Sequence, residues 1–357
     1  MLKVRDQKIW PNVIPSPMSG VTDRPFRQLI RDLAGGRIGI SVTEFISVDA
    51  AQRFTPKSFR QLRTFAGECP LCIQIFGAKP ESMAAGAAQM VGNGADFVEI
   101  NGGCPVPKVI GRGGGSSLLK DLPRLKSMLQ QVRKAIEVPL FLKVRVGWDE
   151  SSINILETLR IAEGEGVELF TIHGRTRVQG YKGLADWDLI NQAASVAKIP
   201  VIGNGDIRSA HEAKARLDQY PALSGVGIGR ALMHNPFVLG QVADLWEGKP
   251  VLEPGPQQQY QMLLRYAELL AEDGFSPQGV LGRLKQMMAR MSRYLEPDAS
   301  VFRLELLHTQ ELEPYLVRLQ HFYQEEYEQG GYQFMPGRIL NLNGKHSTEM
   351  EEGRQFK

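Results

Sequence analysis

The sequence predicts an α/β protein, a (β/α)8 TIM barrel followed by a C-terminal helical-bundle domain. Eight short β-rich runs alternate with segments whose apolar residues repeat at helical spacing, which is the pattern of parallel βα units. The length of 357 residues also suits one barrel of about 250 residues with an added domain. From about residue 260 only the helical spacing continues.

The eight expected strands follow one another along the first two thirds of the chain. They span 13–18, 39–45, 71–76, 97–101, 140–146, 169–173, 201–204 and 225–229. Most are followed by an amphipathic pattern, for example at 80–91 and 209–217. Eight such units predict a closed barrel.

A proline- and glycine-rich stretch marks the expected end of the barrel, because both residues interrupt helices. Three repeats of helical spacing come after it, and then a polar tail that we expect to be poorly ordered. The expected divisions are the barrel at 1–247, a linker at 248–257, a helical domain at 258–330 and the tail at 331–357.

Composition indicates a globular protein without a membrane segment. Hydrophobic residues make up 43% and charged residues 23% of the chain, and no stretch approaches the roughly 18 apolar residues of a membrane helix. The charged N-terminus and only three cysteines lead us to expect a cytoplasmic protein with reduced thiols. Residues 1–257 carry a net charge of +6, 258–330 of −4 and 331–357 of +1. The basic barrel suits a polyanionic partner, although many metabolic enzymes are equally basic.

Polar side chains interrupt the apolar alternation near the carboxyl ends of five strands. Barrel enzymes build their active sites at these ends, so we expect one polar basin there. Burying Lys143 and Arg145 without anions would cost several kcal/mol, which indicates a bound anionic cofactor or substrate. The residues expected in the basin are Gln74, Glu99, Asn101, Lys143, Arg145, His173 and Asn204.

Glycine-bearing turns follow the last two expected strands. They are Asn204-Gly205-Asp206 and Gly227-Ile228-Gly229-Arg230. Backbone amides approach a ligand closely where no Cβ intervenes, and Arg230 adds a fork of donors. The turns therefore predict a phosphate site, the alternative being two tight βα turns.

Cys104 follows the fourth expected strand, on a loop bounded by Gly103 and Pro105. A thiol with an ordinary pKa near 8.5 is protonated at neutral pH and can donate a proton. The Cys69–Cys72 pair, by contrast, precedes a strand and lacks further metal ligands nearby. We therefore expect Cys104 to be catalytic and predict no metal site.

The chain resembles the tRNA-dihydrouridine synthase family, in order, along nearly the whole barrel. The helical segment at 260–329 is also similar to the family's C-terminal tRNA-binding domain. The matching segments are SPMSGVTDRPFR at Ser16, TEFISVD at Thr43, QIFG at Gln74, EINGGCP at Glu99, GGGSSLLKD at Gly113, KVRVGW at Lys143, IHGRTRVQGY at Ile172, PVIGNGDI at Pro200 and GIGRA at Gly227.

The resemblance implies that FMN, reduced by NADPH, passes a hydride to C6 of a D-loop uridine while Cys104 protonates C5. It implies that Asn101 and Arg145 contact the uracil. The implied FMN contacts are Pro17, Met18, Ser19, Gln74, Lys143, His173, Asn204, Gly205, Asp206, Gly229 and Arg230.

The helical domain is net acidic but carries a basic stripe. Arg283, Arg290 and Arg293 fall on one helix face with Gln286, which suits tRNA phosphates; the alternative is an ordinary solvated face. We expect a monomer whose partners are tRNA and NADPH. The target uridine stays open, because segments lean toward different bacterial subgroups.

Two other functions are compatible with these features. One is an FMN barrel oxidoreductase acting on a small molecule, similar to dihydroorotate dehydrogenase, which would not need the added helices. The other is a non-catalytic RNA-binding protein, which would bind RNA without flavin. A yellow purified protein would argue against the second.

Overall fold

The structure is a computed structural model that describes residues 2–48 and 60–336. Most of the tail expected at 331–357 lies outside the described residues. The chain divides into two units. The first contains Met1–Leu232 and Pro236–Val251, and the second contains Met233–Asn235 and the chain from Leu252 onward.

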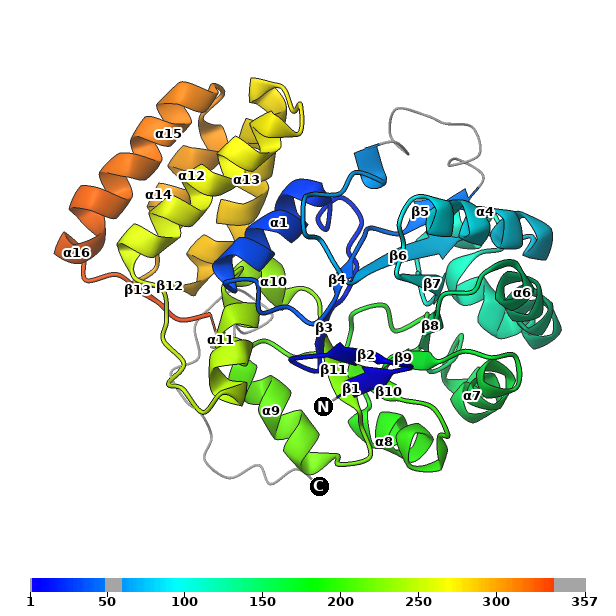
Figure 1. The fold of residues 1–357 in the computed structure, drawn as a ribbon. Helices are drawn as coiled ribbons and strands as arrows, with labels where there is room; N and C mark the ends of the chain where they lie inside the picture. Colours follow the sequence, from blue (N-terminus) through cyan, green and yellow to red (C-terminus); the bar gives the residue numbers. More distant parts are fainter. Residues whose placement is uncertain (1, 49–59, 337–357) are drawn as a thin grey trace. The chain divides into compact units, whose positions relative to one another are not determined.

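Eight parallel strands of the first unit form a nearly closed barrel, which confirms the predicted fold (Figure 1). They are hydrogen-bonded in the order β3-β11-β10-β9-β8-β7-β6-β4, and β5 (Ile46–Ser47) also pairs with β6. The barrel strands are β3 (Val13–Pro15), β4 (Ser41–Val42), β6 (Leu71–Phe76), β7 (Phe97–Gly102), β8 (Leu140–Arg145), β9 (Leu169–His173), β10 (Val201–Asn204) and β11 (Gly225–Ile228).

Helices follow the strands and surround the barrel (Figure 1). Asp23, Asp121, Asp186 and Ser209 cap four of them by accepting a hydrogen bond from a backbone N–H of the first turn. The longer helices are α1 (Arg24–Leu33), α4 (Pro80–Gly92), α6 (Leu122–Ala135), α7 (Ile155–Gly164), α8 (Trp187–Val196), α9 (Ala210–Gln219) and α11 (Val238–Trp246). The short ones are α5 (Pro107–Ile110), η1 (Gly115–Lys120), η2 (Glu150–Ser152) and α10 (Ala231–His234).

A hairpin that the sequence did not predict closes the amino end of the barrel. β1 (Leu2–Val4) pairs antiparallel with β2 (Gln7–Ile9). Leu2, Val4 and Ile9 are buried in one cluster with residues at the starts of the strands, including Phe97 and Phe141. Burying each such side chain contributes about 1.5–3 kcal/mol, so this end is a stabilising core.

The described part of the second unit, up to residue 336, is helical with one short antiparallel strand pair. Its first helix begins at Pro256, inside the stretch expected as a linker, because proline is well suited to the first turn. Its elements are α12 (Pro256–Glu272), α13 (Pro277–Met291), η3 (Ser292–Tyr294), β12 (Leu295–Glu296), α14 (Ser300–His308), α15 (Leu312–His321), the π-helix η4 (Phe322–Glu326), α16 (Tyr327–Gln329) and β13 (Gln333–Phe334).

Candidate active site at the carboxyl ends of the barrel strands

The carboxyl ends of five neighbouring strands bring the expected polar side chains together. Paired residues of parallel strands lie side by side, and every second residue faces the same way. Seven polar side chains therefore meet at one end of the barrel. The Cα register pairs Gln74 with Glu99, Asn101 with Lys143, Arg145 with His173, and His173 with Asn204.

Hydrogen bonds connect these side chains across the barrel. Asn101 Nδ2 donates to Gln74 Oε1 at 2.8 Å, and Gln74 Nε2 donates to Glu99. Lys143 Nζ donates to Asn204 Oδ1 at 2.9 Å, and Asn204 Nδ2 donates to the carbonyl of Gly227 at 2.8 Å. The basin is thus organised by its own side chains.

Glu99 and Lys143 form a buried pair of opposite charge. Burial raises the pKa of Glu99 to about 7, against the favourable charge of Lys143 and the hydrogen bond from Gln74. Burial lowers the pKa of Lys143 to about 8, although Glu99 favours its charged form. The pKa of each group thus lies closer to neutral pH than its usual value.

Arg145 and His173 lie beside further cations. Burial lowers the pKa of Arg145 to about 10, which keeps it charged at neutral pH. The pKa of His173 is well below its usual value, because of burial first and then the charges of Arg145 and Lys143. His173 is therefore a neutral imidazole, and the net charge of this part of the site is positive.

Cys104 lies on the loop after β7 and is only 7% exposed. Its backbone N–H donates to Asn101 Oδ1 at 2.9 Å. Gly115, with φ of +58°, packs against this loop, and a Cβ there would lie 2.7 Å from the Cys104 carbonyl oxygen. Burial raises the pKa of the thiol more than the backbone of Val106 and the charge of Arg145 lower it. The thiol is therefore protonated at neutral pH.

Asp206, after β10, fixes two arginines in the site. Its carboxylate accepts from Arg175 Nη2 at 2.8 and 2.7 Å and from Arg230 Nη2 at 3.2 Å. Gly205 beside it has φ of +134°, and a Cβ there would lie 2.5 Å from that of Ala185. Glycine is therefore needed at this turn, and the Asp206 side chain is occupied with positioning.

The loop after β3 carries Pro17, Met18 and Ser19, which are half-buried or exposed. Thr22 Oγ1 closes this loop: it accepts from the Met18 N–H at 3.0 Å and donates to the Met18 carbonyl at 3.2 Å. Ser16, at the base of the loop, accepts from Asn204 Nδ2 at 3.1 Å. The loop is thereby tied to the basin.

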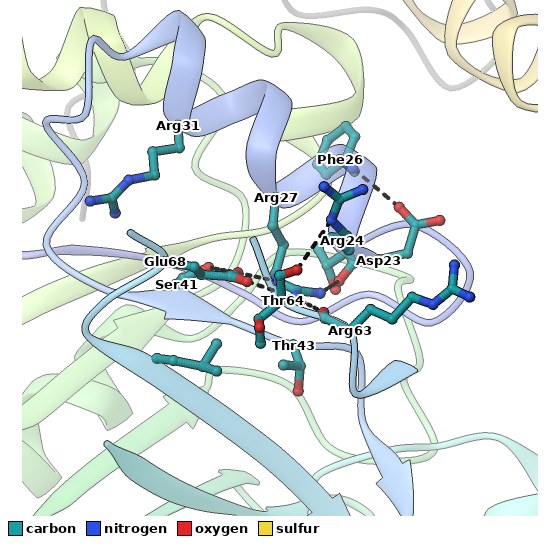
Figure 2. Close-up of polar contacts among 12 residues, drawn as sticks. Asp23, Arg24, Phe26, Arg27, Arg31, Ser41, Thr43, Arg63, Thr64 and Glu68 are labelled. Atoms are coloured by element: carbon teal, nitrogen blue, oxygen red, sulfur yellow. Dashed lines mark hydrogen bonds and ion pairs between the residues drawn. The ribbon is translucent and has the colours of Figure 1, made fainter. Parts of the chain in front are cut away.

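Arg27 and Glu68 form a buried ion pair next to this loop (Figure 2), and Arg27 contacts it at Thr22. Arg27, on α1, donates to Glu68 at 2.5 and 3.1 Å, and both side chains are at most 2% exposed. Arg27 Nη1 also donates to the Thr22 carbonyl at 3.0 Å, and Ser41 Oγ donates to Glu68 at 2.6 Å. Since every charge here has a partner, the cluster is a structural brace.

Two further residues of the site, Arg175 and Tyr181, were not assigned from the sequence. The Tyr181 ring centroid lies 5.7 Å from the Arg145 guanidinium and 4.6 Å from that of Arg230. Both lie within the segment IHGRTRVQGY, and their closeness to His173 in the sequence could have indicated that they belong to the site. Their partners on other strands could not be read from spacing.

The arginines expected on the second unit lie on or just after α13. Arg283 Nη1 donates to Gln286 Oε1 at 3.4 Å, and Arg290 Nη1 donates to the Gln286 carbonyl at 2.7 Å. Burial, and then the charge of Arg293, lowers the pKa of Arg290. Arg290 and Arg293 are thus close enough to repel each other, which an anion between them would relieve.

The other cysteines take no part in the basin. Cys69 is exposed, and Cys72 is buried in the apolar cluster at the amino end of the barrel. Burial raises the pKa of Cys72 well above its usual value. Cys72 is therefore a core residue.

A family model described as dihydrouridine synthase matches residues 14–326. A probable tRNA-dihydrouridine synthase of Rhizobium leguminosarum bv. phaseoli is 41% identical over 231 residues, which are 65% of this chain and 71% of the relative. tRNA-dihydrouridine synthase B of Xanthomonas campestris pv. campestris is 36% identical over 281 residues, covering 78% of this chain and 83% of the relative.

A solved structure shows the same fold. Histamine dehydrogenase from Rhizobium sp. 4-9 superimposes with a TM-score of 0.51 at 14% identity, over 73% of this chain and half of that one. At this identity the likeness concerns the barrel architecture alone. Within residues 2–48 and 60–336, no helix has the length and apolar character needed to cross a bilayer.

Proposed function

The chain belongs to the dihydrouridine synthase family, and from that premise we propose how its residues carry out the reaction. The protein is a flavin-dependent oxidoreductase that forms dihydrouridine in tRNA. Family membership favours this function over the small-molecule oxidoreductase and the non-catalytic RNA-binding protein. The observation that carries the proposal is the buried cationic basin beside a protonated thiol.

We assign FMN to the basin and NADPH as its reductant. The donors fit an anionic cofactor, because half-buried Lys143, buried Arg145 and exposed Arg230 lie at the same end of the barrel. Bound FMN supplies the hydride, and Lys143 stabilises the negative charge of its reduced form. The residues proposed to hold it are Pro17, Met18, Ser19, Gln74, Lys143, His173, Asn204, Gly205, Asp206, Gly229 and Arg230.

Among these, Gln74 and Asp206 have constrained roles. Asn101 and Glu99 hold both ends of the Gln74 amide, so its orientation is set before the cofactor binds. The Asp206 carboxylate is engaged by Arg175 and Arg230, so this residue acts by positioning Arg230 for the phosphate. Preorganisation of this kind lowers the entropic cost of binding.

Cys104 is the proposed proton donor. Hydride adds to C6 of the uracil, the Sγ–H bond breaks, and the proton adds to C5, so that the C5–C6 double bond is saturated. The thiolate that remains is stabilised by the charge of Arg145 and regains its proton from solvent. The raised pKa supports this role, because only the protonated thiol can donate.

Asn101 and Arg145 are the proposed contacts to the uracil. Arg145 Nε donates to the Gly103 carbonyl at 3.0 Å, and Nη1 donates to the carbonyls of Thr176 and Gly180, both at 2.9 Å. These bonds fix the orientation of the guanidinium. The target base has to leave its stack to reach such a buried site.

The second unit is proposed to bind tRNA through its arginine stripe. Arg283, Arg290 and Arg293 offer three cations along one helix and the turn after it. Phosphate contacts of this kind give affinity without sequence preference. The same proposal places a monomeric enzyme in the cytoplasm, where tRNA and NADPH occur together.

Mass-spectrometric mapping of tRNA tests this function. Unmodified tRNA transcript is incubated with protein and NADPH, and digests are searched for a uridine heavier by two hydrogens. We expect one position in the D-loop to change. Activity on free orotate with unaltered tRNA would overturn the proposal.

A further inference from the structure

The exposed apolar side chains of the barrel unit are concentrated on one part of its surface. Among the residues described in this unit, six large apolar side chains are strongly exposed. Five of them lie on the loops that follow β7, β8 and β9, and the sixth, Val196, ends α8. The five are Val106, Ile153, Val178, Tyr181 and Leu184, with exposures of 46%, 45%, 59%, 59% and 76%.

These three loops surround the site on one side, and we call their exposed residues the rim surface. Val106 is two residues from Cys104, and Val178 and Leu184 flank Tyr181, whose ring faces Arg145. Apolar groups gathered beside a site, rather than scattered, mark a surface that a partner covers. The rim surface therefore suits a partner that binds beside the basin.

The rim surface is also basic. Lys108, Arg112, Lys120 and Lys182 are exposed on the same loops. Two of the four acidic residues on these loops, Asp121 and Asp186, cap α6 and α8, whose N-termini offset part of their charge. A third, Asp149, accepts hydrogen bonds from Ser151 and Ser152. The fourth is Glu150. The balance of free charge favours an anionic partner.

The loops hold one another in place. The N–H groups of Arg177 and Val178 donate to the carbonyls of Gly147 and Trp148, each at 3.0 Å. The Trp148 ring centroid lies 4.6 Å from the Arg177 guanidinium and 4.7 Å from Lys120 Nζ. The rim surface is therefore preformed, which reduces the ordering cost when a partner binds.

We propose that the rim surface binds the unpaired nucleotides that flank the target uridine. Unstacked bases expose apolar faces, which would pack on Val106, Val178 and Leu184, while their phosphates meet the lysines. A duplex would offer phosphates but keep its base faces stacked, so it would not use the apolar groups. This inference rests on the proposed function and adds which part of the RNA the barrel holds.

Apolar substitutions on the rim surface provide the first test. The double variant Val178→Ser with Leu184→Ser is compared with the control Val196→Ser. Val196 is as exposed as Val178 but lies at the C-terminal end of α8, away from the three loops. The dissociation constant for unmodified tRNA transcript is measured, with bound flavin per chain as the check on folding. We expect the double variant to bind about tenfold more weakly, since a stacked base contributes about 1–3 kcal/mol, and the control to bind like wild type.

Charge substitutions provide the second. Each phosphate contact of a single strand contributes about 0.7 to the slope of log Kd against log salt concentration. The double variant Lys108→Ser with Lys182→Ser removes two such contacts, so its slope should be lower by about 1.4. Lys3→Ser, on the hairpin at the amino end, is the control. If the wild type forms dihydrouridine but both rim variants bind tRNA with the same affinity and the same salt slope as the wild type, this inference is wrong and the proposed function still stands. A wild type that leaves tRNA unmodified overturns the proposed function as well.

Discussion

The two ends of the barrel are built from the same strands but have opposite chemistry. At the amino end, Phe97 and Phe141 stack with ring centroids 4.8 Å apart in a cluster closed by the hairpin. At the carboxyl end of the same strands, Asn101, Lys143 and Arg145 form the cationic basin. The difference lies in successive residues on one face of each strand.

β7 shows the change over five residues. Phe97, Glu99 and Asn101 alternate with apolar residues and so lie on the same face, at three heights in the barrel. Phe97 belongs to the core, Glu99 bonds Gln74, and Asn101 holds the Cys104 loop. The amino end thus contributes stability that offsets the cost of burying charges at the other end. Substitutions at the two ends should therefore affect different properties.

Cys104→Ala should produce the largest effect. Turnover should fall by about 10²- to 10⁴-fold, because a positioned acid is lost, while FMN and tRNA binding and the unfolding midpoint stay near those of wild type. Single-turnover formation of dihydrouridine by pre-reduced enzyme measures it. Cys69→Ser removes an exposed thiol outside the basin and should leave turnover intact. Undiminished turnover by Cys104→Ala would remove the thiol from the mechanism.

Phe97→Ala should produce the opposite result. We expect the free energy of unfolding to fall by about 3–5 kcal/mol, through the loss of buried contacts and the cavity left behind. Urea unfolding of the apoprotein measures this, and Phe97→Leu should cost less. The folded variant should bind FMN with unchanged affinity. A proportionate loss of FMN affinity would show that the two ends are not separate.

Lys143→Met tests whether the positive charge at the carboxyl end of the barrel acts on the flavin. Loss of the cation should weaken FMN binding by about 10- to 100-fold, as for a hydrogen bond from a charged group, and lower the flavin midpoint potential. Flavin fluorescence titration and spectroelectrochemistry measure these quantities. Lys3→Met, on the amino-end hairpin, should change neither. An unaltered potential in Lys143→Met would argue against contact with the flavin ring.

Glu99→Gln should change how stability depends on pH. Because the pKa of Glu99 in the folded state is raised to about 7, the folded protein keeps a proton that the unfolded chain releases near pH 4.5. Stability of the wild-type apoprotein should therefore fall as pH rises from about 4.5 to 7, by on the order of 2–3 kcal/mol relative to the variant. Urea unfolding at both pH values measures the change, and any constant offset between the proteins cancels. Parallel pH profiles would contradict a raised pKa.

Local signals in the sequence were sufficient for the barrel and for most of the residues near its site. Alternation within strands placed Gln74 and Lys143 inward, and chain order placed Gly205 and Arg230 at the ends of the last strands. Contacts between distant residues were not predictable. Arg27 and Glu68 are 41 positions apart, and nothing in the spacing indicates their ion pair. The same holds for Tyr181 and Arg230.

By itself, the sequence determined the fold class and the end of the barrel at which the polar side chains meet, because strand periodicity and chain order encode them; it also singled out Cys104 as the candidate proton donor. Tertiary structure alone decided that the N-terminal hairpin closes the barrel, that Asp206 holds two arginines, and that Cys104 is buried enough to remain protonated. These features depend on packing between residues far apart in the chain. Such packing decides the distances between side chains and how far each is removed from water, and it produces no periodic pattern in the sequence.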